Sequence, residues 1–271
     1  MRSVSLLLIS GVLMAAGLTQ PAGAQTPAPP APAASSAPAP GSVTPPAAAP
    51  APVAAPAPTP APTPAAASAT SGPVYCVTYF EIAPSGSRKA TTLLRQFAEA
   101  TRKADGNTEL TVLHEIARPG RFAIVEAWHD KAALDAHGAA MKALGDKLQP
   151  LFLSPYDVRQ FVPLSVAAPA ADTGPGAVYV LTHVDVFPQG KDEVTAMVKQ
   201  LAEDSRKDPG AQRFDAVVWD GHLNHFHLIE VWADRKSLEA HAAADHTKAF
   251  RAKLVPFEGA FYDERLYEVV K

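Results

Sequence analysis

The chain has 271 residues and an almost balanced charge, with 24 Lys and Arg against 27 Asp and Glu. A net charge of −3 and the lack of a basic run argue against nucleic acid or an anionic lipid surface as a partner. The single cysteine, Cys76, excludes an intramolecular disulfide, and its apolar neighbours indicate a small buried side chain. We therefore expect a small molecule or another protein as the partner.

Residues 1–24 have the order of a secretory signal. Arg2 gives a positive start, an apolar run extends from Val4 to Leu18, and small residues Ala22-Gly23-Ala24 form an exit site. The run is short for a bilayer span. We expect a signal peptide that is removed, no membrane span after its removal, and a secreted or periplasmic protein. An uncleaved N-terminal anchor is the alternative.

Residues 25–72 contain 15 prolines and no charged residue, and Ala, Ser and Thr supply most of the rest. Such a segment buries too little apolar surface to offset the entropy of ordering, and its prolines favour extended polyproline II. The composition predicts a disordered Pro/Ala-rich linker that acts as a tether. A Pro-rich ligand for a groove on a partner is the other interpretation.

The rest of the chain repeats itself. Residues 125–137 read VEAWHDKAALDAH and residues 229–241 read IEVWADRKSLEAH, 104 positions later. The match runs through both halves, with a slip of two residues inside the helix that follows. This pattern predicts a duplicated domain of ordinary size for one small core, at 73–165 and 176–271, joined by a linker at 166–175.

Each repeat has the same predicted order of elements. A β-rich run ends at a Pro/Gly turn, and apolar residues spaced i, i+3, i+4, i+7 then predict an amphipathic helix. Two further strands follow, then a helix that Asp130 or Asp234 can N-cap, and a closing strand. The predicted strands are at 74–82, 110–115, 121–128 and 157–164, and at 178–186, 214–220, 226–232 and 264–270.

This β-α-β-β-α-β order predicts an α+β fold of two ferredoxin-like repeats. In the strand at 178–186, Val180 and Val184 lie on one face while Tyr179 and Leu181 lie on the other, so both faces need cover. We expect the repeats to pack sheet to sheet, with helices outside, as a single-chain α+β barrel. The chain would then be its own pseudo-dimer.

Both repeats resemble the antibiotic biosynthesis monooxygenase family in a strand that ends Glu-x-Trp, followed by a helix with Leu-x-x-His. The family also has a Lys-Ala-Phe-like segment after this helix. The matching residues are Glu126, Trp128, Leu134 and His137 in the first repeat, and Glu230, Trp232, Leu238, His241, His246 and Lys248-Ala249-Phe250 in the second. The resemblance implies a dimeric α+β barrel. It also implies cofactor-independent oxygenation of quinols or polyhydroxylated aromatics, bound between sheet and helices, with molecular oxygen as co-substrate and no cofactor.

The resemblance also implies that Trp128 and Trp232 line the substrate pocket, where an indole offers an aromatic wall and one N–H donor. Phe226 and Leu228 share the strand face of Trp232 and are expected to contact the substrate with it. Core tryptophans that close the layer between helix and sheet are the alternative. A polar group is used at the position of Leu228 by some oxygenases of the family, so this residue departs from their pattern.

His183, in the first strand of the second repeat, is the sharper catalytic candidate, because a neutral imidazole could accept a phenolic proton. Its counterpart in the first repeat is Tyr79, a poor base and a candidate for substrate binding. We include Trp232 and His241 with His183 as catalytic candidates. His137 is expected to bind substrate, although both helix histidines could equally have a packing role.

Other functions remain open. A secreted, non-catalytic binding or interaction module would suit the same barrel and tether. A metal site at His222, His225 and His227 lacks a carboxylate or thiolate to complete it, so no metal is expected. Heme degradation is disfavoured because residues 145–147 and 250–252 contain no histidine where heme-degrading relatives ligate iron. A hydrolase or isomerase has no supporting motif.

Overall fold

A computed structural model describes residues 72–167 and 173–271. The expected signal at 1–24, the Pro/Ala-rich segment up to residue 71, and part of the expected linker, 168–172, lie outside the described residues. Within the two described ranges, no helix combines the length and the apolar character that crossing a bilayer requires.

The first repeat contains β1, α1, β2, β3, α2 and β4 in the predicted order. Their bounds are Val74–Glu81, Ser87–Thr101, Asn107–Glu115, Arg121–Trp128, Lys131–Leu148 and Asp157–Ser165. The apolar stripe of α1 is buried at Ala90, Leu94, Phe97 and Ala98. Asp130 is the N-cap of α2, where its side chain accepts a 2.9 Å hydrogen bond from the backbone N–H of Ala133. Local sequence signals therefore explain where both helices form.

The second repeat contains β5, α3, β6, β7, α4, α5 and β8. Their bounds are Val178–Asp185, Lys191–Ser205, Ala211–Trp219, His225–Trp232, Arg235–Ala242, Asp245–Leu254 and Asp263–Val269. The helix that is continuous in the first repeat is broken here at Ala243 and Ala244. The break takes up the two residues by which the second repeat is longer at this point.

Short 3-10 turns complete each repeat, at Pro84–Gly86, Gln149–Leu151, Pro188–Gly190 and Val255–Phe257. Gly106 and Gly210 occupy equivalent turns after α1 and α3, with φ of 78° and 82°. A Cβ on Gly210 would lie 2.2 Å from Ser237 Oγ, so the close approach of the turn to α4 requires glycine there.

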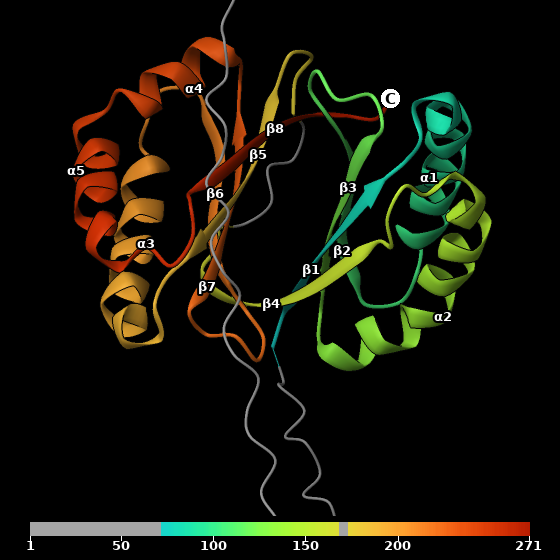
Figure 1. The fold of residues 1–271 in the computed structure, drawn as a ribbon, viewed down its shortest axis with the longest axis horizontal. Coiled ribbons are helices and arrows are strands. Elements are labelled where there is room, and N and C mark those ends of the chain that lie inside the picture. Colours follow the sequence, from blue (N-terminus) through green and yellow to red (C-terminus); the bar gives the residue numbers. More distant parts are fainter. Residues whose placement is uncertain (1–71, 168–172) are drawn as a thin grey trace, which may run out of the picture. The chain divides into compact units, whose positions relative to one another are not determined.

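In the described residues, eight strands form a closed antiparallel barrel in the order β1-β3-β2-β8-β5-β7-β6-β4 (Figure 1). Each repeat supplies four neighbouring strands, and the repeats join where β2 pairs with β8 and β4 pairs with β6. Helices α1 and α2 cover one side, and α3, α4 and α5 cover the other (Figure 1). The prediction of a single-chain α+β barrel is confirmed.

The barrel separates two kinds of core. Interior side chains come from both repeats, among them Val77, Leu181 and Ile229, and pack together inside the sheet. Outside it, the helices of each repeat form their own layer with the sheet, the larger of them around Val180 and Val198. The alternation of Val180 and Leu181 between the two faces follows from the twofold periodicity of a strand. The inner face of each four-stranded repeat is therefore covered by the inner face of the other repeat.

Candidate functional site

The residues expected to form one site lie on two faces of the sheet. Strand β5 pairs with β7 in a register that sets His183 opposite His227 inside the barrel. Trp232 points outward, in the helix–sheet core that also contains Phe226 and Leu228. The structure therefore does not bring His183 and Trp232 together, because consecutive residues of a strand point to opposite faces of the sheet and these two residues lie on different faces.

In the second repeat, Trp232 is fully buried beneath α4. Its indole N–H donates a 2.9 Å hydrogen bond to Glu230 Oε2, and its ring stacks on His241 with centroids 4.5 Å apart. Burial raises the pKa of Glu230 from 4.5 to about 8. This Glu-Trp-His group is a packed, hydrogen-bonded part of the core.

The first repeat has a looser version of the same group. The rings of Trp128 and His137 have centroids 4.7 Å apart, and His137 Nε2 lies 3.5 Å from Glu126 Oε1. Burial raises the pKa of Glu126 to about 7, and it lowers the pKa of His137. The indole N–H of Trp128 is buried without a hydrogen-bond partner in the described residues. The two groups have thus diverged in their hydrogen bonding.

A cluster of three rings inside the barrel brings His183 together with Tyr79. The ring centroids of these two residues are 5.4 Å apart, although they occupy equivalent positions in different repeats. His227 completes the cluster, with its ring centroid 4.6 Å from that of His183 and its Nε2 atom 3.3 Å from the Tyr79 hydroxyl. We call Tyr79, His183 and His227 the inner ring cluster.

Two arginines reach this cluster, one from the last strand of each repeat. Arg159 on β4 donates to Nδ1 of His183 at 3.3 Å and to Asp157 at 2.8 Å. Arg265 on β8 pairs with Asp263, and its guanidinium lies 5.8 Å from the centre of the Tyr79 ring. The arginine side chains are about a quarter to a third exposed, at 26% and 31%. Each arginine is paired with the aspartate two residues before it, and the two pairs border the inner ring cluster.

Burial and the two arginines set the charge of the histidines. Burial, followed by the positive charges of Arg159 and Arg265, lowers the pKa of His183 to about 4. Burial also holds the pKa of His227 well below its ordinary value. Both imidazoles are therefore neutral at neutral pH. Because Arg159 donates to Nδ1 of His183, the hydrogen of this neutral ring is on Nε2, which becomes a donor.

The inner ring cluster opens to two neighbouring cavities. One has a volume of about 340 Å³ and is lined by Tyr79, Asp157, Arg159, His183, Asp185, Ala260, Phe261, Asp263 and Arg265. The second, of about 180 Å³, shares Tyr79, Asp157 and Arg265 with the first. Beside the carboxylates of three aspartates, a ring-sized molecule in the first cavity would meet two guanidinium groups, a neutral imidazole and an aromatic wall, and the guanidinium groups and the imidazole are hydrogen-bond donors. This is the chemistry needed to hold a phenolic oxygen that carries negative charge.

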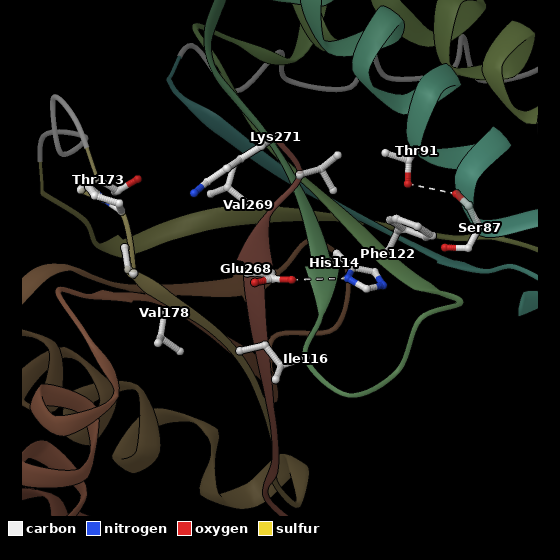
Figure 2. Close-up of a pocket in the computed structure, with 15 residues that line it drawn as sticks. Ser87, Thr91, His114, Ile116, Phe122, Thr173, Val178, Glu268, Val269 and Lys271 are labelled. Carbon is white, nitrogen blue, oxygen red and sulfur yellow. Dashed lines mark hydrogen bonds and ion pairs between the residues drawn. The ribbon is translucent and has the colours of Figure 1, made fainter.

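A larger groove, of about 770 Å³, lies on the outer face where β2 meets β8. Ser87 and Thr91 on α1 border it on one side and Thr173 borders it on the other, with His114 and Glu268 between them (Figure 2). His114 Nδ1 and Glu268 Oε1 are 3.8 Å apart. Fewer charged side chains line this groove than line the cavity of about 340 Å³ beside the inner ring cluster, so we rank the groove second as a candidate site.

The three histidines weighed as a metal site from the sequence do not form one group, because only His222 and His225 lie close together, with ring centroids 5.6 Å apart. His225 Nδ1 lies 2.9 Å from Asp185 Oδ1, and His222 packs against Trp219 with ring centroids 4.5 Å apart. His227 lies inside the barrel. His225 and His227 therefore have different surroundings and do not belong to one group of metal ligands, although they share a strand face.

Sequence reasoning missed Arg159, Arg265 and His227 as parts of the site with His183. The sequence does not point to the two arginines, because their strands are distant in the chain from those of Tyr79 and His183. The signal that could have found them is the pairing of β1 with β4 and of β5 with β8. These pairs set Tyr79 beside Asp157 and His183 beside Asp263, two residues before each arginine.

Comparison with known proteins identifies the fold. The family model described as "Antibiotic biosynthesis monooxygenase" matches residues 73–142 and again residues 177–253, together more than half of the chain. No curated protein sequence matches the chain.

Solved structures with similar folds include a candidate monooxygenase from Lactobacillus acidophilus NCFM, at 17% identity and a TM-score of 0.62, over 74% of this chain and 95% of that one. A candidate monooxygenase from Fusobacterium nucleatum has 17% identity and a TM-score of 0.67, over 74% and 94%. An anthrone oxidase-like protein has 14% identity and a TM-score of 0.58, over 74% and 93%. At these identities the likeness is one of fold.

Proposed function

This chain belongs to the antibiotic biosynthesis monooxygenase family, and on that premise we propose that it oxygenates phenolic aromatic molecules at the inner ring cluster. The observation that carries the proposal is the cavity of about 340 Å³ where Arg159, Arg265 and His183 converge. Its volume is at the lower end of the range for small-molecule sites, which suits a ligand of one or two rings.

The proposed reaction needs no group beyond substrate and oxygen. A phenol with hydrogen at the carbon opposite its hydroxyl gives a quinone and water: one oxygen atom enters the carbon, the other leaves as water, and the substrate supplies all four electrons. The protein's task is to favour the phenolate, because that electron-rich form reacts with oxygen. This is electrostatic stabilisation of developing negative charge by groups already in place.

The geometry changes the role that we propose for His183. With Arg159 donating to Nδ1, its Nε2 offers a hydrogen-bond donor, and a pKa of about 4 makes it a weak acceptor of a phenolic proton. We propose that His183 and Arg265 donate to the phenolic oxygen and lower its pKa, while Arg159 fixes the imidazole. Solvent at the open side of the cavity would then take the proton.

The test is oxygen consumption, with products identified by mass spectrometry, on a panel of hydroxylated one- and two-ring aromatics without added metal or flavin. The rate should rise with pH as the bound phenol ionises. The variants Arg265→Gln and His183→Ala should each shift that rise to higher pH, because each removes a donor to the phenolic oxygen. The exposed His129→Ala is the matched control and should behave as wild type. Wild-type turnover no faster than autoxidation of the substrates would overturn the proposal.

A non-catalytic binding module is the second candidate. The observation that favours it is the complete burial of Trp232, since the face on which the family resemblance places the substrate is filled by core side chains. This reading expects aromatic ligands to bind the cavity of about 340 Å³ without oxygen uptake. Quenching of Trp219, over which Arg159 lies at 4.8 Å, would report such binding.

We also propose that the protein works outside the cytoplasm, with residues 1–24 removed as a signal and residues 25–72 acting as a tether. The support is the order of Arg2, an apolar run and an A-G-A exit in the sequence. Expression of the full chain in a Gram-negative host, followed by fractionation and intact-mass measurement, tests this. A periplasmic species lacking 24 residues is expected. A membrane-bound species that retains them would mean an anchor instead.

A further inference from the structure

The second repeat contains a group of potential metal ligands that the first repeat lacks. Asp208 Oδ2 lies 2.8 Å from His241 Nδ1 and 3.2 Å from His246 Nε2. One ligand atom from each residue lies within 4.8 Å of the others, and no other such group of three occurs in the part of the chain that the structure describes. At the position of Asp208 the first repeat has Ala104.

The broken helix of the second repeat creates this arrangement. Helix α4 ends at Ala242, just after His241, and α5 begins at Asp245, just before His246. In the first repeat α2 runs unbroken from Lys131 to Leu148. The break lets two consecutive helices present one histidine each to the turn between α3 and β6, where Asp208 lies. Three separate elements therefore supply one group.

The neighbours of the group orient its side chains. His241 stacks on Trp232 and has the Thr247 hydroxyl 3.3 Å from its Nδ1 atom. His246 Nε2 is 3.5 Å from the Ser205 hydroxyl, which is buried. The His241 side chain is 7% exposed, whereas those of Asp208 and His246 are 16% and 25% exposed. One side of the group is therefore held in the core and the other is open to solvent.

We propose that Asp208, His241 and His246 bind a divalent transition-metal ion. Two imidazoles and one carboxylate are ligands that Zn²⁺, Fe²⁺ and related ions take. Ligands at about 2.0–2.1 Å from a tetrahedral ion lie about 3.3 Å from each other, so the two Asp208–histidine spacings of 2.8 and 3.2 Å are close to those of a metal site. The ligand nitrogens of His241 and His246 lie within 4.8 Å of each other, and metal binding would draw them together. The solvent-facing side leaves positions for water or another ligand.

The site is distinct from the inner ring cluster, because it lies in the outer layer of helices whereas His183 lies inside the barrel. An ion there would tie the turn after α3 to both halves of the broken helix. Binding to the folded protein alone stabilises it by mass action, so metal should raise the melting temperature. The test therefore needs no knowledge of the protein's reaction.

The experiment is titration of the metal-free, untagged protein with ZnCl₂ by calorimetry, followed by thermal melts with Zn²⁺ and with a chelator. We expect one equivalent of Zn²⁺ to bind and to raise the melting temperature. Asp208→Ala, which installs the residue of the first repeat, and His246→Ala should each weaken binding by more than about 100-fold, because loss of even an outer partner costs about 10- to 100-fold.

The exposed His222→Ala is the control, and it should bind as wild type. Asp208→Asn and His246→Gln preserve size and hydrogen bonding, so they separate loss of a ligand from loss of fold, which circular dichroism would detect. Absence of Zn²⁺ binding in the wild type would overturn the proposal and leave a hydrogen-bonded trio. Retention of full affinity in both conservative variants would overturn it as well.

Discussion

Two positions that the duplication made equivalent meet inside the barrel with opposite charges. Arg213 on β6 donates to Glu109 Oε1 on β2 at 2.5 Å, and these residues are 104 positions apart. Arg213 also donates to Asp215 Oδ2 at 2.7 Å. The side chains of Arg213, Asp215 and Glu109 are 4%, 1% and 14% exposed. The group thus joins the repeats through a largely buried triad of charges.

Replacement of Arg213 by Met should destabilise the protein by about 3–5 kcal/mol. At an effective dielectric of about 20, a pair of charges about 4 Å apart interacts by about 4 kcal/mol, and desolvation offsets much of this. The variant leaves Glu109 without its cation and leaves Asp215 with only the more distant Arg206, whose Nη2 is 3.9 Å from Asp215 Oδ1; an unpaired buried carboxylate is the costly outcome. Asp215 retains a 3.0 Å hydrogen bond from the backbone of Ala167, whereas the Glu109 carboxylate has no further hydrogen bond among the described residues. Glu109→Gln should cost less, about 1–3 kcal/mol, since Arg213 keeps Asp215.

Urea unfolding at pH 7, followed by tryptophan fluorescence and circular dichroism, measures these differences. Arg235→Met is the matched control, because it removes the same kind of side chain from an exposed pair with Glu239 and should cost less than about 1 kcal/mol. A loss of less than about 1 kcal/mol for Arg213→Met would refute the reasoning. It would mean that water reaches the triad and screens it.

Three further predictions concern buried groups and a turn. Burial raises the pKa of Glu230 from 4.5 to about 8, so the folded state holds a proton that the unfolded state releases; stability should fall as pH rises between these values, and Glu230→Gln should flatten that fall in urea titrations. Trp232→Phe should cost more than Trp128→Phe in the same assay, because only Trp232 donates a hydrogen bond, to Glu230. Gly210→Ala should lower the melting temperature markedly, since its φ is 82° and the new Cβ would meet Ser237.

The fold could be predicted from the sequence because two independent signals agreed. Periodicity located the strands and helices, and the offset of 104 residues applied the same plan twice. The alternation of Val180 and Leu181 then required a cover on each face of the sheet, which the barrel provides. Element bounds followed from local chemistry such as the N-cap Asp130.

The site could be predicted only in part, because its residues are neighbours through strand pairing rather than through sequence. Tyr79 and His183 were chosen as equivalents, but their contact depends on how the two sheets close on each other. Arg159 and Arg265 reach them from strands far along the chain. His183 and Trp232 were expected to be catalytic together because of their chemistry, but they lie on opposite faces of the sheet.

The broken helix was visible in the sequence only as a slip of two residues. An insertion can extend a helix, bulge it or break it, and the pattern does not distinguish these outcomes. In the structure the break lies between His241 and His246 and turns both toward Asp208. The proximity of Asp208, His241 and His246 therefore depends on how the helix accommodates two extra residues, which the periodicity of apolar residues does not predict.

Because the domain is duplicated within one chain, equivalent positions of the two repeats can carry different residues where they contact each other. In a symmetric dimer of identical domains, a residue at such a position meets its own copy, so Arg213 would face another Arg213 and Glu109 another Glu109. Like charges at this spacing repel strongly inside a sheet. Within one chain the two positions vary separately, which permits the Glu109–Arg213 pair at 2.5 Å and the Tyr79–His183 contact at 5.4 Å. The same freedom allows the imidazole of His183 to lie beside two guanidinium groups while the equivalent position carries Tyr79. Two identical subunits would instead have the same side chain at both positions.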